Sequence, residues 1–380
     1  MHSLPILTMR ILVAPDKFKL TLSAGQVAGI ISSVLNGNGH EVIQCPLADG
    51  GEGTFELLTA ACGGTTYRMM VSDPLGRRVA AEFGRSPDGI TAYIDMSQAA
   101  GLFRLDANER DPERTTTFGV GEMIAEAIRL GAKNIIIGCG GSATNDGGVG
   151  MAVALGYRFM DVNGNAFVPT GGTLSRISWI DDAHVNLSLK ETRITVISDV
   201  TNPFTGPEGA SVVFAPQKGA HPDAILRLDE GLKHLASIFE KRTGFLIRSI
   251  RGAGAGGGFT GGAAWFLGAD SQPGADWVMH HTGFMEKLRL ADLVITGEGR
   301  LDEQSLRGKV VSKVAGACRS LSIPCQVVCG ESLFPEEEEV IPGVAGILSL
   351  TSLAGSPKAA MERSAFWLER AAESLVSRLK

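Results

Sequence analysis

Two hydrophobic periods alternate along the chain, and together they predict a succession of strands and helices. Short β-type apolar runs lie at residues 10–15, 40–47, 89–96, 132–138, 193–200, 291–296, 324–330 and 344–350. Segments with apolar residues every three or four positions, typical of one helix face, lie at residues 23–39, the later part of 48–62, 115–131, 149–156, 222–242, 309–321 and 358–379. This alternation over the full length predicts an α/β fold with mainly parallel sheets.

The first of these helices carries signals at both ends. Ser23 and Gln26 have the spacing of a capping box, in which each side chain binds the backbone N–H of the other residue. Gly37 can close the helix, since glycine is favoured just beyond a helix end. A helix beginning next to Ser23 is therefore predicted.

The length of 380 residues predicts more than one domain, because a single core rarely grows beyond about 250–300 residues. Residues 71–89 have the pattern of a hairpin that leaves the first unit, and residues 271–277 form a second loop-rich break. We expect a discontinuous α/β domain of residues 1–75 plus 285–380. We expect a second α/β domain, of residues 76–284, to be inserted in the first. The active site is expected to lie in the cleft between the two domains.

Polar, glycine-rich segments follow five of the predicted strands, at residues 14–23, 47–54, 138–148, 198–206 and 296–304. Parallel sheets place ligand sites at the carboxyl ends of their strands, so these segments predict one shared active cleft. They and their neighbours contain acids, cations and short polar groups: Asp16, Asp49, Glu52, Asp146, Asp199, Glu298, Asp302, Lys19, Lys218, Arg300, Lys309, Ser142, Thr144, Asn145 and Asn202. Such groups can hold Mg²⁺, accept a hydroxyl proton and cradle phosphate, as phosphoryl transfer requires.

The net charge and the length of the apolar runs argue against a nucleic-acid-binding protein and against a membrane-spanning one. The formal net charge of −6 argues against a general nucleic-acid surface. The apolar stretches are too short and too often broken by glycine to span a bilayer, and the N-terminus lacks a basic leader. We expect a cytoplasmic protein, monomeric or homodimeric, that acts on a small molecule.

One glycine pattern keeps a different enzyme class open. Gly138, Gly140 and Ala143 fit G-x-G-x-x-A after a strand, with Asp161 further on, as in dinucleotide-binding proteins. An NAD-linked oxidoreductase of small hydroxyacids is therefore one alternative, although this pattern leaves the other four loops unexplained. A non-catalytic protein that binds a nucleotide or organic acid in the same cleft is another.

Seven segments occur in an order typical of one enzyme family: RILVAPDKFK, PLADGGEGT, GGSATNDGGVGM, SDVTNPF, FAPQKGA, GAGAGGGFTGG and ITGEGRLDEQSLRGK. From Met9 to Lys380 the chain resembles the bacterial glycerate kinase type 1 family. The resemblance implies a transferase that uses ATP and Mg²⁺ to phosphorylate D-glycerate, usually at the 2-hydroxyl, giving 2-phosphoglycerate. Met9 resembles the usual family start, so residues 1–8 are expected to be either an extension or the result of a mis-called start. Lys17 stands where the family motif usually has serine.

The glycine loop is the predicted nucleotide site of this kinase. Phosphate-binding residues are expected to be Gly140, Gly141, Ser142, Thr144, Asn145, Lys218 and Gly254. Asp199 with Asn202 is the first choice for the Mg²⁺ site or the catalytic base, because oxygen ligands suit this ion. Asp302 is the competing carboxylate for this role.

Glycerate is expected to bind through charged side chains of the other loops. Arg300 or Lys19 would pair with its carboxylate as part of the catalytic group, with Arg300 favoured for its bidentate geometry. Asp49 and Glu52 would accept hydrogen bonds from the glycerate hydroxyls or hold metal-bound water, and Asp16 is assigned to the same substrate site.

Overall fold

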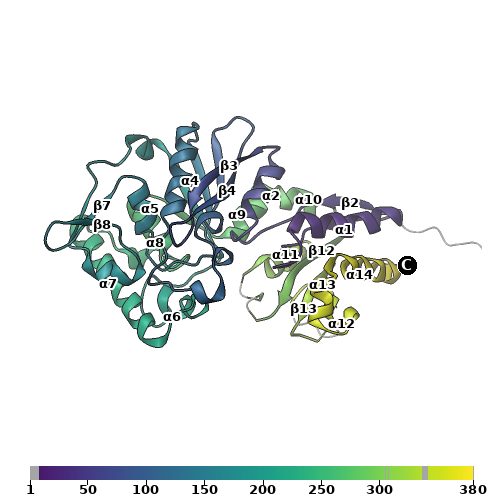
Figure 1. The fold of residues 1–380 in the computed structure, drawn as a ribbon. Coiled ribbons are helices and arrows are strands. Elements are labelled where there is room, and N and C mark those ends of the chain that lie inside the picture. The colour runs from purple at the N-terminus through teal and green to yellow at the C-terminus, as the bar shows by residue number, and fades with distance from the viewer. Residues whose placement is uncertain (1–7, 304, 307, 336–340, 380) are drawn as a thin grey trace, which may run out of the picture. The chain divides into compact units, whose positions relative to one another are not determined.

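The computed structural model describes residues 8–303, 305–306, 308–335 and 341–379, and the chain divides into two compact units. Unit 1 contains Met1–Asp49 and Ala275–Lys380, and unit 2 contains Gly50–Gly274. The purple beginning and the yellow end of the chain therefore lie in the same unit (Figure 1). Residues 1–7 of the expected extension lie outside the described residues.

Unit 1 is built on a five-stranded parallel sheet with the order β14-β13-β12-β1-β2. Its strands are β1 (Arg10–Val13), β2 (Glu41–Gln44), β12 (Leu293–Leu301), β13 (Cys325–Ser332) and β14 (Val344–Ser349). Its helices are α1 (Ala24–Gly37), α9 (Gly274–His281, which starts at the unit boundary), α10 (Phe284–Leu288), α11 (Val310–Ser320), α12 (Leu350–Ala354), α13 (Pro357–Glu362) and α14 (Ser364–Leu379). Ile11, Leu12 and Val13 are fully buried, so both faces of β1 are covered, as a parallel sheet requires.

The core of unit 1 joins the two ends of the chain. Val27 and Ile31 of α1 share one hydrophobic cluster with Leu368 and Leu375 of α14. The expected capping box is present at the start of α1, where Ser23 and Gln26 bind each other's backbone N–H groups. The single terminal helix expected for residues 358–379 is instead divided into α13 and α14 around Arg363, whose backbone leaves the helical region at φ −134°.

Unit 2 contains a six-stranded sheet with the order β11-β10-β6-β5-β4-β3, parallel from β11 to β5 and antiparallel beyond. Its strands are β3 (Thr65–Ser72), β4 (Arg78–Arg85), β5 (Thr91–Asp95), β6 (Asn134–Gly138), β10 (Arg193–Ile197) and β11 (Asp270–Gln272). Its helices are α2 (Thr54–Ala61), α3 (Ser97–Ala100), α4 (Phe118–Arg129), α5 (Val149–Ala154), α6 (Ala210–Phe214), α7 (Pro222–Thr243) and α8 (Phe259–Leu267), with several 3-10 turns. A separate antiparallel sheet contains β7 (Arg158–Met160), β8 (Ala166–Phe167) and β9 (Trp179–Asp181) in the order β8-β7-β9.

The unit boundaries differ from those expected at residues 75 and 285. Strand β3 pairs along its whole length with β4, from Thr65 opposite Arg85 to Ser72 opposite Arg78. These contacts place α2 and β3 in unit 2, because the hairpin adds to the edge of that sheet. The mainly parallel α/β architecture itself is confirmed.

One expected loop is a strand. Residues 297–301 extend β12, because Glu298, Arg300 and Leu301 pair with Cys329, Glu331 and Ser332 of β13. Strand β2 is shorter than expected and ends at Gln44. No helix in the described part of the chain is both long and apolar enough to cross a membrane.

Candidate active site

A glycine loop connects β6 to α5 in unit 2, at the carboxyl end of a central parallel strand. Gly141, Gly147 and Gly148 have φ angles of +71°, +61° and +77°, a region that side-chain-bearing residues rarely adopt. Gly140 needs glycine for a different reason: a Cβ there would lie 2.6 Å from the Cα of Gly51. Of these positions Gly141 is exposed, whereas Gly147 and Gly148 are buried and their N–H groups already donate to Gly257 O and Asp146 Oδ1.

Asp146 fixes the shape of this loop from inside. Its carboxylate is fully buried and accepts hydrogen bonds from Thr117 N (2.8 Å), Thr117 Oγ1 (2.8 Å), Gly148 N (3.1 Å) and Gly150 N (3.2 Å). Burial raises the pKa of Asp146, while these bonds act in the opposite direction. Its contacts give Asp146 a structural role at the starts of α4 and α5.

Lys218 supports the loop through its ammonium group. This side chain, in the 3-10 helix η5 (Pro216–Lys218), is 2% exposed, and its Nζ donates to Ser142 Oγ (2.8 Å) and Thr144 O (2.7 Å). Burial lowers the pKa of Lys218 to about 8. Asn145 is held similarly, because its amide nitrogen donates to Ser211 Oγ at 2.9 Å.

Three buried polar atoms beside the loop have no hydrogen-bond partner within the described residues: Thr144 Oγ1, Asn145 Oδ1 and Ser97 Oγ. Ser97 lies against the loop, since a Cβ on Gly141 would be 3.4 Å from its Cβ. A buried polar atom without a partner costs about 1–3 kcal/mol, so such atoms are rare unless a ligand or water completes them. Their concentration here indicates a binding site.

A second loop of unit 2 lies next to the first. Asp95, at the end of β5, accepts from the backbone N–H groups of Gly53 (2.7 Å), Thr54 (3.0 Å) and Phe55 (3.1 Å) at the start of α2. This carboxylate fixes residues 50–53 beside the glycine loop, where a Cβ on Gly138 would lie 2.9 Å from Gly50 O. Glu52 belongs to this segment and is partly buried.

The predicted metal residues follow β10, the strand next to β6 in the same sheet. Asp199 and Asn202 are both partly buried; Asn202 Nδ2 donates to Glu208 O at 2.8 Å, and Gly254 N donates to Asn202 O at 3.0 Å. These bonds connect the expected Gly254 to the same region. Within the described residues, no three acidic, histidine or cysteine side chains are grouped as metal ligands.

Unit 1 contains a cluster of carboxylates and lysines at the carboxyl ends of β1, β2 and β12. Asp16 follows β1 and is 9% exposed; its backbone N–H donates to Gly297 O of β12 at 2.8 Å. Lys17 Nζ lies 3.9 Å from Asp16 Oδ1 and 3.6 Å from Asp49 Oδ1, so it bridges two expected substrate residues. Burial raises the pKa of Asp16, and Lys17 opposes this shift.

Glu298 completes the cluster. Its Oε1 is buried and has no hydrogen-bond partner within the described residues, and burial raises the pKa of its carboxyl to about 7. Asp16 and Asp302 add to this shift by charge repulsion, whereas Ser305 and Lys309 oppose it. The structure therefore places Glu298, Asp16 and Asp302 close enough to influence one another electrostatically.

The remaining expected residues of unit 1 lie at the edge of this cluster. Arg300 is exposed and its Nε lies 3.5 Å from Glu331 Oε2. Lys19 is exposed, and a Cβ on Gly299 of β12 would lie 2.7 Å from its backbone nitrogen. Asp302 N donates to Ser305 Oγ at 3.0 Å.

The expected site residues therefore fall into two groups, one in each unit. Unit 1 holds Asp16, Lys19, Asp49, Arg300 and Asp302, and unit 2 holds Glu52, Gly140, Gly141, Ser142, Thr144, Asn145, Asp199, Asn202, Lys218 and Gly254. Sequence reasoning gave no role to Asp95, which lies near the end of the strand predicted over residues 89–96, or to Ser97, which follows that strand. The shared cleft stays a prediction.

A glycine loop flanked by unpartnered buried polar atoms in one α/β unit and an acid–lysine cluster in the other contain the kinds of group that phosphoryl transfer requires. A family model described as "Glycerate kinase family" matches residues 11–380. The chain belongs to this family.

Curated relatives and a solved structure agree with this membership. The chain is 40% identical over 376 residues to a glycerate kinase of Bacillus subtilis (strain 168), covering 98% of both chains. It is 43% identical over 324 residues to a glycerate 2-kinase of Escherichia coli (strain K12), covering 85% of both. A crystal structure assigned as glycerate kinase 2 from Salmonella typhimurium LT2 has a TM-score of 0.81 and 38% identity, covering 97% of this chain and 99% of that one.

Proposed function

We propose that this protein transfers the terminal phosphoryl group of ATP to D-glycerate, at the 2-hydroxyl, in a Mg²⁺-dependent reaction. Family membership and the named relatives support glycerate as the acceptor. We further expect a cytoplasmic monomer or homodimer with no nucleic-acid partner.

The observation that carries the nucleotide part is the set of orphaned polar atoms beside the glycine loop. Thr144 Oγ1, Asn145 Oδ1 and Ser97 Oγ are buried without partners in the described chain. A backbone N–H group at a positive-φ glycine can form part of an anion-binding concavity, and Gly141 is the exposed glycine of this kind in the loop. Hydroxyl groups can complete the coordination of phosphate oxygens. The loop fits a polyphosphate. Lys218 stabilises the loop through its bonds to Ser142 Oγ and Thr144 O.

Asp199 and Asn202 are the residues we propose to hold Mg²⁺. One or two protein oxygen ligands, completed by substrate phosphate and water, are usual for this ion, so a pair of side chains is sufficient. When bound, Mg²⁺ neutralises charge on the transferred phosphoryl group.

Glycerate fits the cluster of unit 1. Lys17, Lys19 and Arg300 supply positive charge for its carboxylate, and Asp49 can accept hydrogen bonds from its hydroxyls. Glu298, which the sequence placed among the loop acids without a role of its own, adds a proton acceptor. Its pKa of about 7 allows it to take up the hydroxyl proton near neutral pH. Asp302 would then orient the substrate.

The NAD-linked alternative is not favoured by the loop geometry. In a dinucleotide fold the glycine fingerprint opens directly into a helix, but here α5 begins only at Val149, well beyond Gly140 and Ala143. Asp161, expected to bind a ribose, instead accepts bonds from Asn163 N and Asn165 N (both 2.9 Å) in its own turn.

The direct test is to incubate purified protein with Mg²⁺-ATP and D-glycerate. We expect ADP to form in equal amount to a phosphoglycerate, with phosphorus and carbon-13 NMR placing the phosphate on carbon 2. ADP release that ignores glycerate would contradict the acceptor. Nucleotide binding without turnover would favour the non-catalytic alternative, and NAD reduction by glycerate would favour the oxidoreductase.

A further inference from the structure

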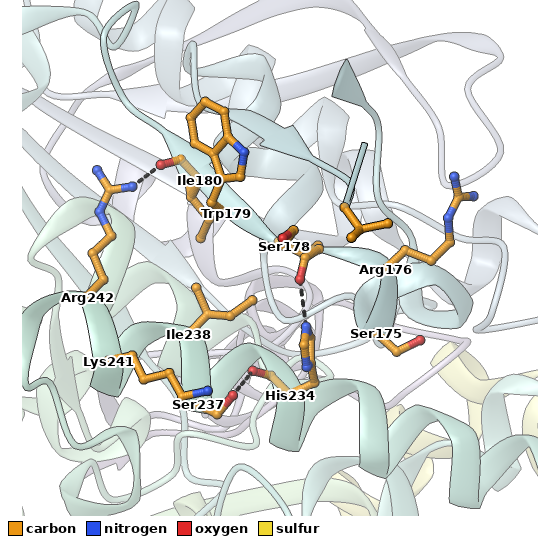
Figure 2. Close-up of a pocket in the computed structure, with 12 residues that line it drawn as sticks. Ser175, Arg176, Ser178, Trp179, Ile180, His234, Ser237, Ile238, Lys241 and Arg242 are labelled. Carbon is orange, nitrogen blue, oxygen red and sulfur yellow. Dashed lines mark hydrogen bonds between the residues drawn. The ribbon is translucent and has the colours of Figure 1, made fainter. Parts of the chain in front are cut away.

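A pocket of about 620 Å³ lies in unit 2 between α7 and the segment from the 3-10 helix η3 (Gly171–Arg176) to β9. This volume is within the range of small-molecule sites. None of its residues belongs to the glycine loop: Val162, Ser175, Arg176, Ile177, Ser178, Trp179, Ile180, His234, Ser237, Ile238, Lys241 and Arg242 (Figure 2). The lining contains two arginines, a lysine and a histidine but no carboxylate, although the protein is acidic overall.

The two walls of this pocket are tied together at both ends. At one end His234 Nε2 donates to Ile177 O at 2.7 Å. At the other, Arg242 donates to Ile180 O (Figure 2). The guanidinium of Arg242 also lies 2.8 Å from Asp182 Oδ2. Both ties join α7 to the opposite wall, so the pocket is preformed.

Between the ties, α7 presents Ser237, Ile238 and Lys241. Ser237 Oγ donates to His234 O at 2.7 Å, which leaves its lone pairs available to a donor. Lys241 is exposed and, within the described chain, forms no ion pair with a carboxylate, whereas Arg242 is already paired with Asp182. Arg176 has no ion pair within the described chain either, but its guanidinium lies over the Phe167 ring at 4.8 Å. Lys241 is therefore the cation we expect to bind an added anion.

The pocket also has an apolar side. The indole of Trp179 is 48% exposed, an unusual position for so large a ring, and Ile238 is half-buried. Exposed aromatic rings are favourable surfaces for the flat face of another ring. A lining that contains both cations and an exposed aromatic ring favours a ligand with both a negative group and a ring.

We propose that this pocket binds a small organic anion that carries a flat ring, and that its occupancy changes nucleotide affinity at the glycine loop. The connection is α7 itself: a Cβ on Gly147 of the loop would lie 2.8 Å from Leu235 Cδ2 and 3.1 Å from Leu232 Cδ2. Asp229 of the same helix accepts from Gly206 N at 2.9 Å, in the segment after Asn202. A ligand that shifts α7 would therefore change the packing of the glycine loop and of the segment after Asn202.

Binding is tested by calorimetric titration of the full chain with phenyl phosphate, without ATP or glycerate. We expect Lys241→Gln to weaken binding at least about tenfold, since it removes a charge-assisted contact, and Trp179→Ala to weaken it about threefold or more. Lys190→Gln, an exposed lysine outside the pocket, is the matched control and should bind like wild type. Inorganic phosphate, which lacks the ring, should bind more weakly than phenyl phosphate.

Absence of binding, or equal affinity in the wild type and Lys241→Gln, overturns the site. The coupling rests on the proposed function and is measured separately, with a nonhydrolysable ATP analogue at saturating phenyl phosphate. We expect its affinity to change about fivefold or more in wild type and not in Lys241→Gln; no change in the wild type overturns the coupling. A failure of the kinase assay does not affect the calorimetric result.

Discussion

Lys17 changes the electrostatics of the acid cluster in unit 1. Its ammonium group lies within 4 Å of both Asp16 and Asp49, so it offsets the repulsion between two carboxylates at neighbouring strand ends. In this chain the lysine therefore adds a cation to the expected glycerate site, where it favours an acidic substrate.

Glu298 gives a residue-scale prediction that combines activity with stability. In the wild type we expect kcat to rise with pH through about 7, as the Glu298 carboxyl loses its proton and becomes a base. Glu298→Gln should lower kcat at pH 8 by about 10²-fold or more and remove this limb of the profile. Initial rates between pH 5.5 and 9 measure both effects.

Stability should change in the opposite sense. The folded pKa of Glu298 lies above its ordinary value because of burial, so the native state favours the protonated form and loses stability as pH rises through about 7. Relative to Glu298→Gln, the wild type should lose on the order of 2 kcal/mol of unfolding free energy between pH 5 and pH 8. Denaturant unfolding at both pH values checks this, with the exposed Glu369→Gln as control. Parallel curves for wild type and Glu298→Gln would show that this carboxyl is not perturbed.

At the scale of elements, buried carboxylates hold the loops of unit 2 against the helices that follow them. Asp95 binds the first N–H groups of α2, and Asp146 binds the starts of α4 and α5. Acceptors at helix starts satisfy backbone donors that have no partner within the helix. Asp146 thus adds side-chain bonds to the backbone bonds that the glycine loop makes with neighbouring segments, such as Ala143 N to Ala100 O and Gly147 N to Gly257 O.

Asp146→Asn tests this role. An amide offers one acceptor oxygen and places an NH₂ donor among the backbone donors around it, so at least one buried donor loses its partner. We expect the free energy of unfolding to fall by about 2–4 kcal/mol and nucleotide affinity to fall with it. Asp161→Asn is the matched control, because Asp161 binds two N–H groups in an exposed turn. Equal losses in the two variants would remove the special role of Asp146.

The elements themselves were largely predictable from hydrophobic periodicity, but their limits and partners were not. The capping box at Ser23 located α1, and the apolar run before Gly138 located β6. Residues 297–301 were expected as a loop because glycine and charge interrupt the apolar run. They form a strand because their backbone pairs with that of β13, which lies next to β12 in the sheet. That pairing is between segments distant in sequence, which local pattern cannot reveal.

At the scale of the whole molecule, the rule that ligands bind at strand carboxyl ends found most of the candidate site. It found Asp16, Asp49 and the glycine loop, because each follows a strand that the pattern identifies. It gave Glu298 no role of its own, because the importance of this residue comes from burial and charged neighbours. It placed Asp49 and Glu52 together, whereas they belong to different units.

The two candidates for the Mg²⁺ ligand or catalytic base, Asp199 and Asp302, lie in different units. Asp199 belongs to unit 2, with the glycine loop and Asn202, whereas Asp302 belongs to unit 1, with Glu298 and Arg300. If Asp199 binds Mg²⁺ and Asp302 orients glycerate, their amide variants should fail in different ways. Asp199→Asn should lower kcat severely, by about 10²-fold or more, and raise the Mg²⁺ concentration needed for half-maximal rate. Asp302→Asn should act through glycerate, in KM or kcat, with little change in the Mg²⁺ requirement. Initial rates from Mg²⁺ titrations at fixed ATP decide between them: the reverse pattern exchanges the two roles, and wild-type kinetics in both variants would remove both acids from the site.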